Sequence, residues 1–121
     1  MFSGKVIYGD GVGKQLGFHT ANLDINVVNI GLNAGVYAAT AFLNKKKYQA
    51  ALAIQKKLGK VEVHLLNYHG PDFYGEELRV EVGGKVSELY EFTNQDELIK
   101  KIGRDIKKVL KIFNSPNSPN F

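Results

Sequence analysis

The residues best suited to chemistry in this chain begin with Thr20 and Asn22, which stand on either side of Ala21 in the segment "LGFHTANLD". On an extended backbone, side chains two residues apart point to the same face. A hydroxyl and an amide oxygen on one face are hard ligands, which suit a Mg²⁺ ion that phosphates also hold. Taken without further motifs, a glycine-rich turn followed by a Thr/Asn turn motif is the simpler interpretation.

A second candidate is Glu62, in the segment "VEVHLL". On a strand, Val61, Val63 and Leu65 share one face, and Glu62 and His64 share the other. A carboxylate beside an apolar face can have a raised proton affinity and act as a general base. Periodicity alone favours an exposed strand with its polar residues outward. A metal shared by the two polar residues is also conceivable, but two ligands are too few for a site.

The segment 9–17, "GDGVGKQLG", contains four glycines and Lys14. It does not fit the P-loop, because the lysine is followed by Gln15 rather than by Ser or Thr. The third glycine of the dinucleotide and protein-kinase fingerprints is also missing. Glycine amides can nevertheless approach an anion closely, and the lysine adds a positive charge.

The composition is that of one ordinary domain of 121 residues with a net charge of +4 and no cysteine. Lysine supplies nearly all of the positive charge, and segment 45–60 contains six lysines and no acidic residue. With only two arginines, a solvated lysine face is favoured over a surface that recognises nucleic acid. No apolar run has the length of a membrane span. We therefore expect a cytoplasmic protein with neither a nucleic-acid nor a membrane partner.

The order of the expected elements indicates a mainly β fold. About six short apolar segments separated by turns, one of them the lysine-rich turn 44–47, predict strands that close into a small barrel. Gly83 and Gly84 are a hairpin candidate within "LRVEVGGKV". From Asn94 onward, apolar residues recur three and four positions apart and predict an amphipathic helix, with the apolar residues Leu98, Ile102, Ile106, Val109 and Phe113.

Several of these segments resemble, in the same order, those of riboflavin kinases, either stand-alone or as the kinase half of bifunctional FAD synthetases. The similar segments are "LGFHTANL", "GVYA", "VEVHLL" and "DFYGEEL", followed by a helix. The resemblance covers roughly residues 4–110. It implies a six-stranded antiparallel Greek-key barrel with a C-terminal α-helix. We expect residues 1–113 to form this unit and residues 114–121 to be a flexible tail.

The resemblance also implies a reaction, in which the γ-phosphate of ATP is transferred to the ribityl 5′-hydroxyl of riboflavin, giving FMN and ADP. It implies that Glu62 is the catalytic base and that Thr20 and Asn22 hold Mg²⁺, with Thr20 also near the nucleotide. The other residues that it places near the nucleotide are Gly9, Lys14, Asn67 and Tyr74. It implies a monomer. No flavin-binding residue is assigned.

The chain departs from the family pattern at three places. The proline that usually precedes Thr-Ala-Asn is His19 here, and the segment of type IGxxPTF is missing from the shorter "AIQKKLGKVE". Ser87 and Leu89 stand where the family usually has an arginine and a glutamate. An active riboflavin kinase of divergent type is the first hypothesis. The missing arginine and the shortened segment motivate an alternative, a catalytically impaired protein that binds flavin or nucleotide as a regulator. A small basic barrel that binds single-stranded nucleic acid is a third, less favoured hypothesis.

Overall fold

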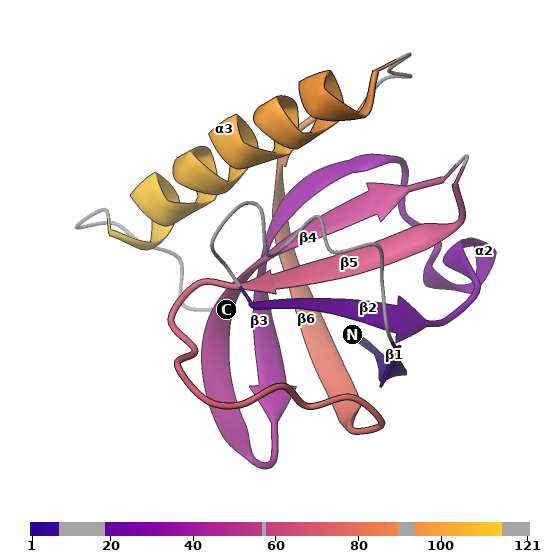
Figure 1. The fold of residues 1–121 in the computed structure, drawn as a ribbon, viewed down its shortest axis with the longest axis vertical. Coiled ribbons are helices and arrows are strands. Elements are labelled where there is room, and N and C mark those ends of the chain that lie inside the picture. The colour runs from indigo at the N-terminus through magenta and orange to yellow at the C-terminus, as the bar shows by residue number, and fades with distance from the viewer. Residues whose placement is uncertain (8–18, 57, 90–93, 115–121) are drawn as a thin grey trace.

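The computed structural model describes residues 1–7, 19–56, 58–89 and 94–114 of the chain. It contains six strands, a short helix and one long C-terminal helix (Figure 1). The strands are β1 (Phe2–Ile7), β2 (His19–Asp24), β3 (Gly35–Leu43), β4 (Lys46–Gln55), β5 (Lys60–Leu65) and β6 (Glu77–Ser87); the helices are α2 (Val27–Ile30) and α3 (Gln95–Phe113). The sequence did not lead us to expect α2.

The six strands form a closed barrel in the order β1-β2-β5-β4-β3-β6, and every neighbouring pair is antiparallel. Strand β2 pairs with β5, its partner from much later in the chain, so the Thr20 and Glu62 segments are brought side by side. The predicted fold class, a six-stranded antiparallel barrel with a C-terminal helix, is therefore confirmed.

The lysine-rich turn joins β3 to β4. Leu43 pairs with Lys46, so the loop consists of Asn44 and Lys45, both with positive φ, at 51° and 70°. Two consecutive left-handed residues make the tight hairpin whose twist matches that of the strands on either side. This part of the sequence prediction is confirmed.

The hairpin candidate at Gly83 and Gly84 is wrong, because both residues lie inside the single strand β6. Ala39 pairs with Val82, whereas Tyr37 pairs with Lys85, so β6 has one residue more than β3 over this interval. A bulge of this kind bends a strand and increases its twist, which helps a small barrel to close. The glycine pair therefore marks a bulge rather than a turn.

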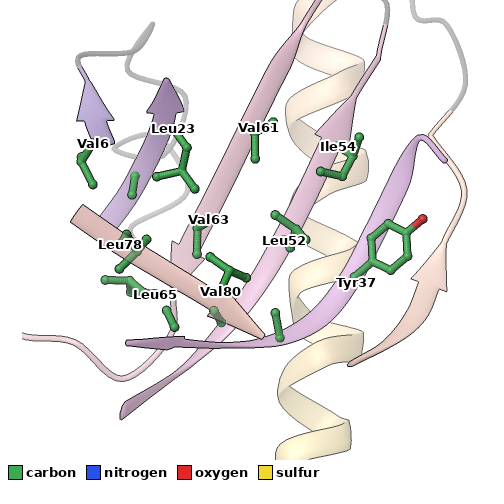
Figure 2. Close-up of a cluster of buried hydrophobic side chains, with 14 of the residues drawn as sticks. Val6, Leu23, Tyr37, Leu52, Ile54, Val61, Val63, Leu65, Leu78 and Val80 are labelled. Atoms are coloured by element: carbon green, nitrogen blue, oxygen red, sulfur yellow. The ribbon is translucent and has the colours of Figure 1, made fainter. Parts of the chain in front are cut away.

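The barrel interior holds the main apolar core (Figure 2). Strand β5 contributes Val61, Val63 and Leu65, as its alternation predicted, and β4 contributes Leu52 and Ile54 from the neighbouring strand. Because these alternate residues point inward, the residues between them point to the outside of the barrel.

Helix α3 packs on the outside of the barrel, against β3, β4 and β6 (Figure 1). Its buried residues Ile102, Ile106 and Val109 form a second core with outward-facing residues of β3 and β4, which we call the apolar patch: Val36, Ala38, Ala51 and Ala53. Asn94 caps the helix, since its side chain accepts a hydrogen bond from the backbone N–H of Asp96. The helix predicted from the three- and four-residue spacing is thus confirmed.

Helix α3 is too polar to cross a bilayer, and neither described helix combines the length and the apolar character that crossing requires. The predicted flexible tail, residues 114–121, falls almost entirely outside the described residues, and the boundary at 113 stays a prediction.

Candidate active site

The register between β2 and β5 brings the candidate residues together. Asn22 lies directly opposite Glu62, and Thr20 lies directly opposite His64. All four side chains alternate with residues of the inner core, so they face the outside of the barrel. We call this group the polar patch. It continues directly into the apolar patch, because Glu62 and His64 are paired on their other side with residues of β4.

Both residues that β5 contributes to the polar patch are buried. Glu62 is 1% exposed and His64 is fully buried, while Thr20 and Asn22 are half-buried. The periodicity had favoured an exposed strand with polar residues outward. The predicted outward direction of Glu62 and His64 is confirmed, but the predicted exposure of these side chains is wrong. Burial of a carboxylate and an imidazole on one strand is unfavourable unless each is partnered, which makes their contacts informative.

His64 is bonded to Thr20, with 2.8 Å between Nδ1 and the hydroxyl oxygen. Burial lowers the pKa of His64 from 6.5 to about 4, so the ring is neutral at neutral pH. A neutral imidazole has one donor and one acceptor nitrogen, and the bond to Thr20 fixes the orientation of the hydroxyl. The Nε2 atom, also buried, has no hydrogen-bond partner within the described part of the chain.

Glu62 accepts a hydrogen bond from the side chain of Gln55, with 2.5 Å between Nε2 and Oε1. Gln55 is the last residue of β4 and is itself only 8% exposed. The bond joins the end of β4 to the outward-facing carboxylate of the neighbouring strand β5. Glu62 is therefore held by a neutral donor, and this contact was not foreseen from the sequence.

The donor set of the polar patch fits a magnesium ion that phosphates help to hold. Thr20 and Asn22 present a hydroxyl and an amide oxygen on one face of β2, next to the carboxylate of Glu62. In the described residues there is no group of three or more His, Cys, Asp or Glu side chains that could hold a metal by themselves. An ion at this patch would thus need ligands from a substrate, which is the usual situation for Mg²⁺ with nucleotides.

Asn67 and Tyr74 lie in the segment that joins β5 to β6. The side-chain oxygen of Asn67 accepts a hydrogen bond from the backbone N–H of Gln49 at 2.9 Å, so this amide supports the end of β4. Tyr74 is 36% exposed and precedes Gly75, whose backbone N–H donates to the carbonyl oxygen of Val6 in β1. Gly75 therefore lies beside β1, just before the start of β6, while Gly9 and Lys14 lie outside the described residues.

His19, at the position of the family proline, ties the start of β2 to the segment after β5. Its Nδ1 lies 3.7 Å from a carboxylate oxygen of Asp72, and its ring meets the ring of Tyr68 edge to face at a centroid distance of 5.0 Å. Tyr68 makes the same kind of contact with Tyr48 and Phe73. These contacts restrain the approach to Thr20 where a proline would have restrained it through φ.

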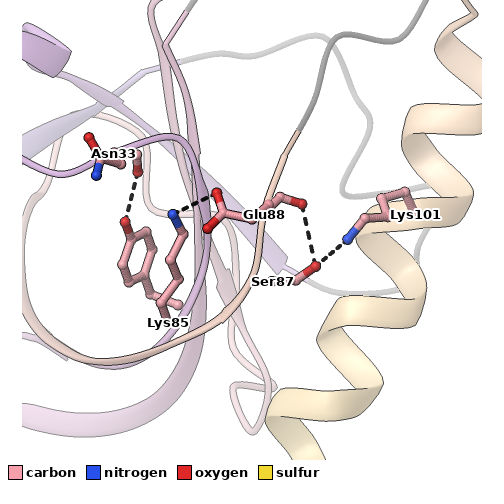
Figure 3. Close-up of polar contacts among 6 residues, drawn as sticks. Asn33, Lys85, Ser87, Glu88 and Lys101 are labelled. Atoms are coloured by element: carbon pink, nitrogen blue, oxygen red, sulfur yellow. Dashed lines mark hydrogen bonds and ion pairs between the residues drawn. The ribbon is translucent and has the colours of Figure 1, made fainter.

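Ser87, at the position of the family arginine, is flanked by two lysines (Figure 3). The ammonium group of Lys101, on α3, donates to the Ser87 hydroxyl and also to a carboxylate oxygen of Asp105 at 2.5 Å. Lys85 donates to Glu88 at 2.8 Å, and this hydrogen bond raises the pKa of Lys85 above its ordinary value. Both ammonium groups are thus paired with carboxylates, so the two lysines do not replace the charge of the family arginine.

Two contacts of the polar patch were missed by sequence reasoning. The alternation of "QAALAIQ" in β4 puts Gln55 on the same face as Ala51 and Ala53, so the sequence could have predicted the outward direction of this side chain. Its contact with Glu62 depends on the β4–β5 register, which the sequence does not specify. The pairing of His64 with Thr20 depends in the same way on the β2–β5 register.

A sequence model of the riboflavin kinase family, Flavokinase, matches residues 1–113, which is nearly the whole chain. Together with the barrel and the polar patch on its outer face, this match defines the class of protein. The chain belongs to the riboflavin kinase family.

The relatives of the chain agree with this family. It is 36% identical over 121 residues to a bifunctional riboflavin kinase/FMN adenylyltransferase of Buchnera aphidicola, covering 93% of this chain and 38% of that protein. It is 33% identical over 120 residues to the RNA-binding riboflavin kinase RibR of Bacillus subtilis, covering 93% of this chain and 51% of that protein. The chain spans about half the length, or less, of these relatives.

A solved structure shares the fold. The crystal structure of riboflavin kinase from Trypanosoma brucei matches with a TM-score of 0.63 and 24% identity, over 96% of this chain and 78% of that chain. At this identity the match supports the architecture, a closed barrel with a C-terminal helix, and not the assignment of individual residues.

Proposed function

We propose that this chain phosphorylates riboflavin, transferring the γ-phosphate of ATP to the ribityl 5′-hydroxyl and releasing FMN and ADP. The observation that carries the proposal is the pairing of Asn22 with Glu62 across β2 and β5, beside Thr20, in a chain of the riboflavin kinase family. A buried carboxylate next to two neutral oxygen ligands can serve as a base at a metal–phosphate site.

In this mechanism Glu62 accepts the proton of the riboflavin hydroxyl. The hydroxyl oxygen forms the new bond to the γ-phosphorus as the bond between that phosphorus and the bridging oxygen of ADP breaks. The charge stays balanced because the proton moves to the carboxylate and the leaving group departs as ADP. Most of the rate acceleration in phosphoryl transfer comes from positioning and charge neutralisation.

Thr20 and Asn22 would hold Mg²⁺, which supplies charge neutralisation for the phosphates when bound. The bond between Thr20 and His64 supports this role, because it fixes the hydroxyl in one direction. When the protein supplies few of the ligands of a metal ion, each of them needs a fixed orientation.

The remaining assignments extend the same proposal. Gly9, Lys14, Asn67 and Tyr74 would contact ATP, with the glycines allowing close approach of the backbone to the phosphates. Residues 1–113 would act as one domain, as a monomer in the cytoplasm, and residues 114–121 as a flexible tail.

The test is FMN formation by the purified chain with riboflavin, ATP and Mg²⁺, resolved by chromatography. Glu62→Gln keeps the shape of the side chain and removes its basicity, so we expect kcat to fall by about 10²–10⁴-fold. The matched control is Glu81→Gln, the same change on strand β6, which should leave kcat within about twofold of the wild type.

Two other outcomes would favour the alternatives. Saturable binding of riboflavin or ATP to a wild-type chain that forms no FMN would favour a regulatory protein. The reason to consider this alternative is that Ser87 replaces the family arginine. Salt-sensitive binding to single-stranded RNA, without any effect of flavin, would favour a nucleic-acid partner. We expect neither, although the Bacillus subtilis relative is named as RNA-binding.

A further inference from the structure

The contact between Gln55 and Glu62 is not part of the apolar packing inside the barrel. Both residues lie on the outer face, so neither contributes to the apolar interior. Gln55 is one of the few buried polar residues of the described chain, and its side-chain amide donates to Glu62.

The local register explains how the contact is made. Ala53 lies directly opposite Glu62, and Gln55 lies opposite Lys60, so Gln55 and Glu62 are diagonal neighbours on adjacent strands. Diagonal neighbours are about 7–8 Å apart at their backbones, which a long side chain can span. The small side chain of Ala53 leaves room for the glutamine to extend along the outer face toward the carboxylate.

The side chain of Gln55 can hold the Glu62 carboxylate in place without neutralising its charge. Its amide is neutral and donates to the carboxylate without forming an ion pair or supplying a titratable proton. A hydrogen bond of 2.5 Å to Oε1 restricts both the rotamer and the plane of the carboxylate group. Catalytic groups need such support, because a displacement of about 1 Å can lower a rate by about 10²-fold.

We infer that Gln55 is a positioning residue for the phosphoryl transfer, holding the Glu62 carboxylate in the orientation in which it takes the proton of the substrate hydroxyl. The inference rests on the proposed function, since it assigns a partner to the proposed base. Gln55 acts through Glu62 and contacts neither substrate in this scheme. Its removal should therefore change the chemical step more than substrate binding.

The experiment uses two substitutions that remove the contact in opposite ways. Gln55→Met keeps the length of the side chain and removes the donor, and Gln55→Asn keeps the amide and is one methylene too short to reach. We expect both to lower kcat by about 10–100-fold while KM for riboflavin and for ATP stays within about threefold. Lys47→Met, at an exposed position near the other end of the same strand, is the control.

A double-mutant cycle separates positioning from a general loss of structure. If Gln55 acts through Glu62, then adding Gln55→Met to Glu62→Gln should lower kcat by less than about twofold further. Thermal unfolding of each variant identifies any that fail to fold, and the Asn variant keeps a polar side chain at this buried position if the Met variant does not fold.

The outcomes distinguish the two proposals. A wild type that forms no FMN, or a Glu62→Gln variant with unchanged kcat, overturns the proposed function and this inference with it. A Glu62→Gln variant that loses activity while both Gln55 variants retain it overturns the inference alone. An undiminished effect of Gln55→Met in the Glu62→Gln background also overturns it, since the glutamine would then act independently of the base.

Discussion

The outer face of the barrel carries two adjoining patches that are both largely buried and differ in what they bury. The apolar patch on β3 and β4 presents small and branched side chains to helix α3. The polar patch on β2 and β5 presents a hydroxyl, an amide, a carboxylate and an imidazole, and the two buried groups are hydrogen-bonded to neighbouring side chains. The two patches lie on the same continuous ladder of paired strands.

We expect the apolar patch to contribute mainly to stability and the polar patch mainly to chemistry. Alanine at 38, 51 and 53 lets α3 approach the sheet closely, and the burial of Ile102, Ile106 and Val109 stabilises the fold. Burial of Glu62 and His64 removes two polar groups from water and contributes little to stability on its own. We therefore expect substitutions in the first patch to affect unfolding, and those in the second to affect turnover or pH dependence.

The largest effect is expected under α3. Ile106 is fully buried against the apolar patch, so Ile106→Ala should lower the free energy of unfolding by about 4 kcal/mol through lost apolar contact and the cavity left behind. Urea denaturation measures this change. The kcat of the folded fraction, measured at low temperature, should stay within about twofold of the wild type. A large fall in kcat would mean that the two patches are coupled.

The next effect concerns pH and His64. The pKa of this histidine is about 4 in the folded chain, because burial disfavours its charged form, against an ordinary value of 6.5 that we take for the unfolded chain. Between these values the unfolded chain binds a proton that the folded chain does not. The contribution is thus fully present above pH 6.5 and is lost as the pH falls toward 4, by about 3 kcal/mol in total.

Urea denaturation between pH 7.5 and 4 tests this expectation. Because carboxylates also titrate near the lower limit, the measured quantity is the difference between the wild type and His64→Asn across the range. His69→Asn, a change at an exposed histidine, is the control. A difference that does not vary with pH would show that His64 can be charged in the folded chain.

The smallest effect is expected at the proposed metal ligand. Asn22→Leu keeps the branched shape of the side chain and removes the amide oxygen, so kcat/KM for ATP at fixed Mg²⁺ should fall about 30-fold, or about 2 kcal/mol. The free energy of unfolding should not decrease, since an apolar side chain replaces a half-buried amide. Asn29→Leu, on the exposed surface of α2, controls for added apolar area. Unchanged kcat/KM would remove Asn22 from the proposed site.

The sequence predicted those parts of this arrangement that depend on periodicity within one strand or helix. The shared face of Thr20 and Asn22, the inward face of β5 and the buried stripe of α3 all follow from spacings of two, three or four residues. The strand pairing β2–β5 does not, because it joins segments about forty residues apart. The opposition of Asn22 to Glu62 and the bond from Gln55 depend on strand pairing and its register, so only the structure reveals them.

The same limit explains the error at Gly83 and Gly84. A glycine pair between alternating segments is compatible with a turn or with a bulge, since both need a backbone free of side-chain clashes. The choice is made by the neighbouring strands: β6 pairs with β1 at its start and with β3 along its length, and a hairpin at the glycines would break the pairing with β3.

Closure of the barrel has a consequence for how this unit behaves beside other polypeptides. Each of the six strands has a hydrogen-bonded neighbour on both sides, so no strand presents a free edge along its whole length to a foreign strand. Such a unit can be fused to another domain or crowded at high concentration with little tendency to exchange strands or to aggregate through its sheet. Strand β1, one of the three shortest, holds the two ends of the ring together, and its loss would expose β2 and β6 at once.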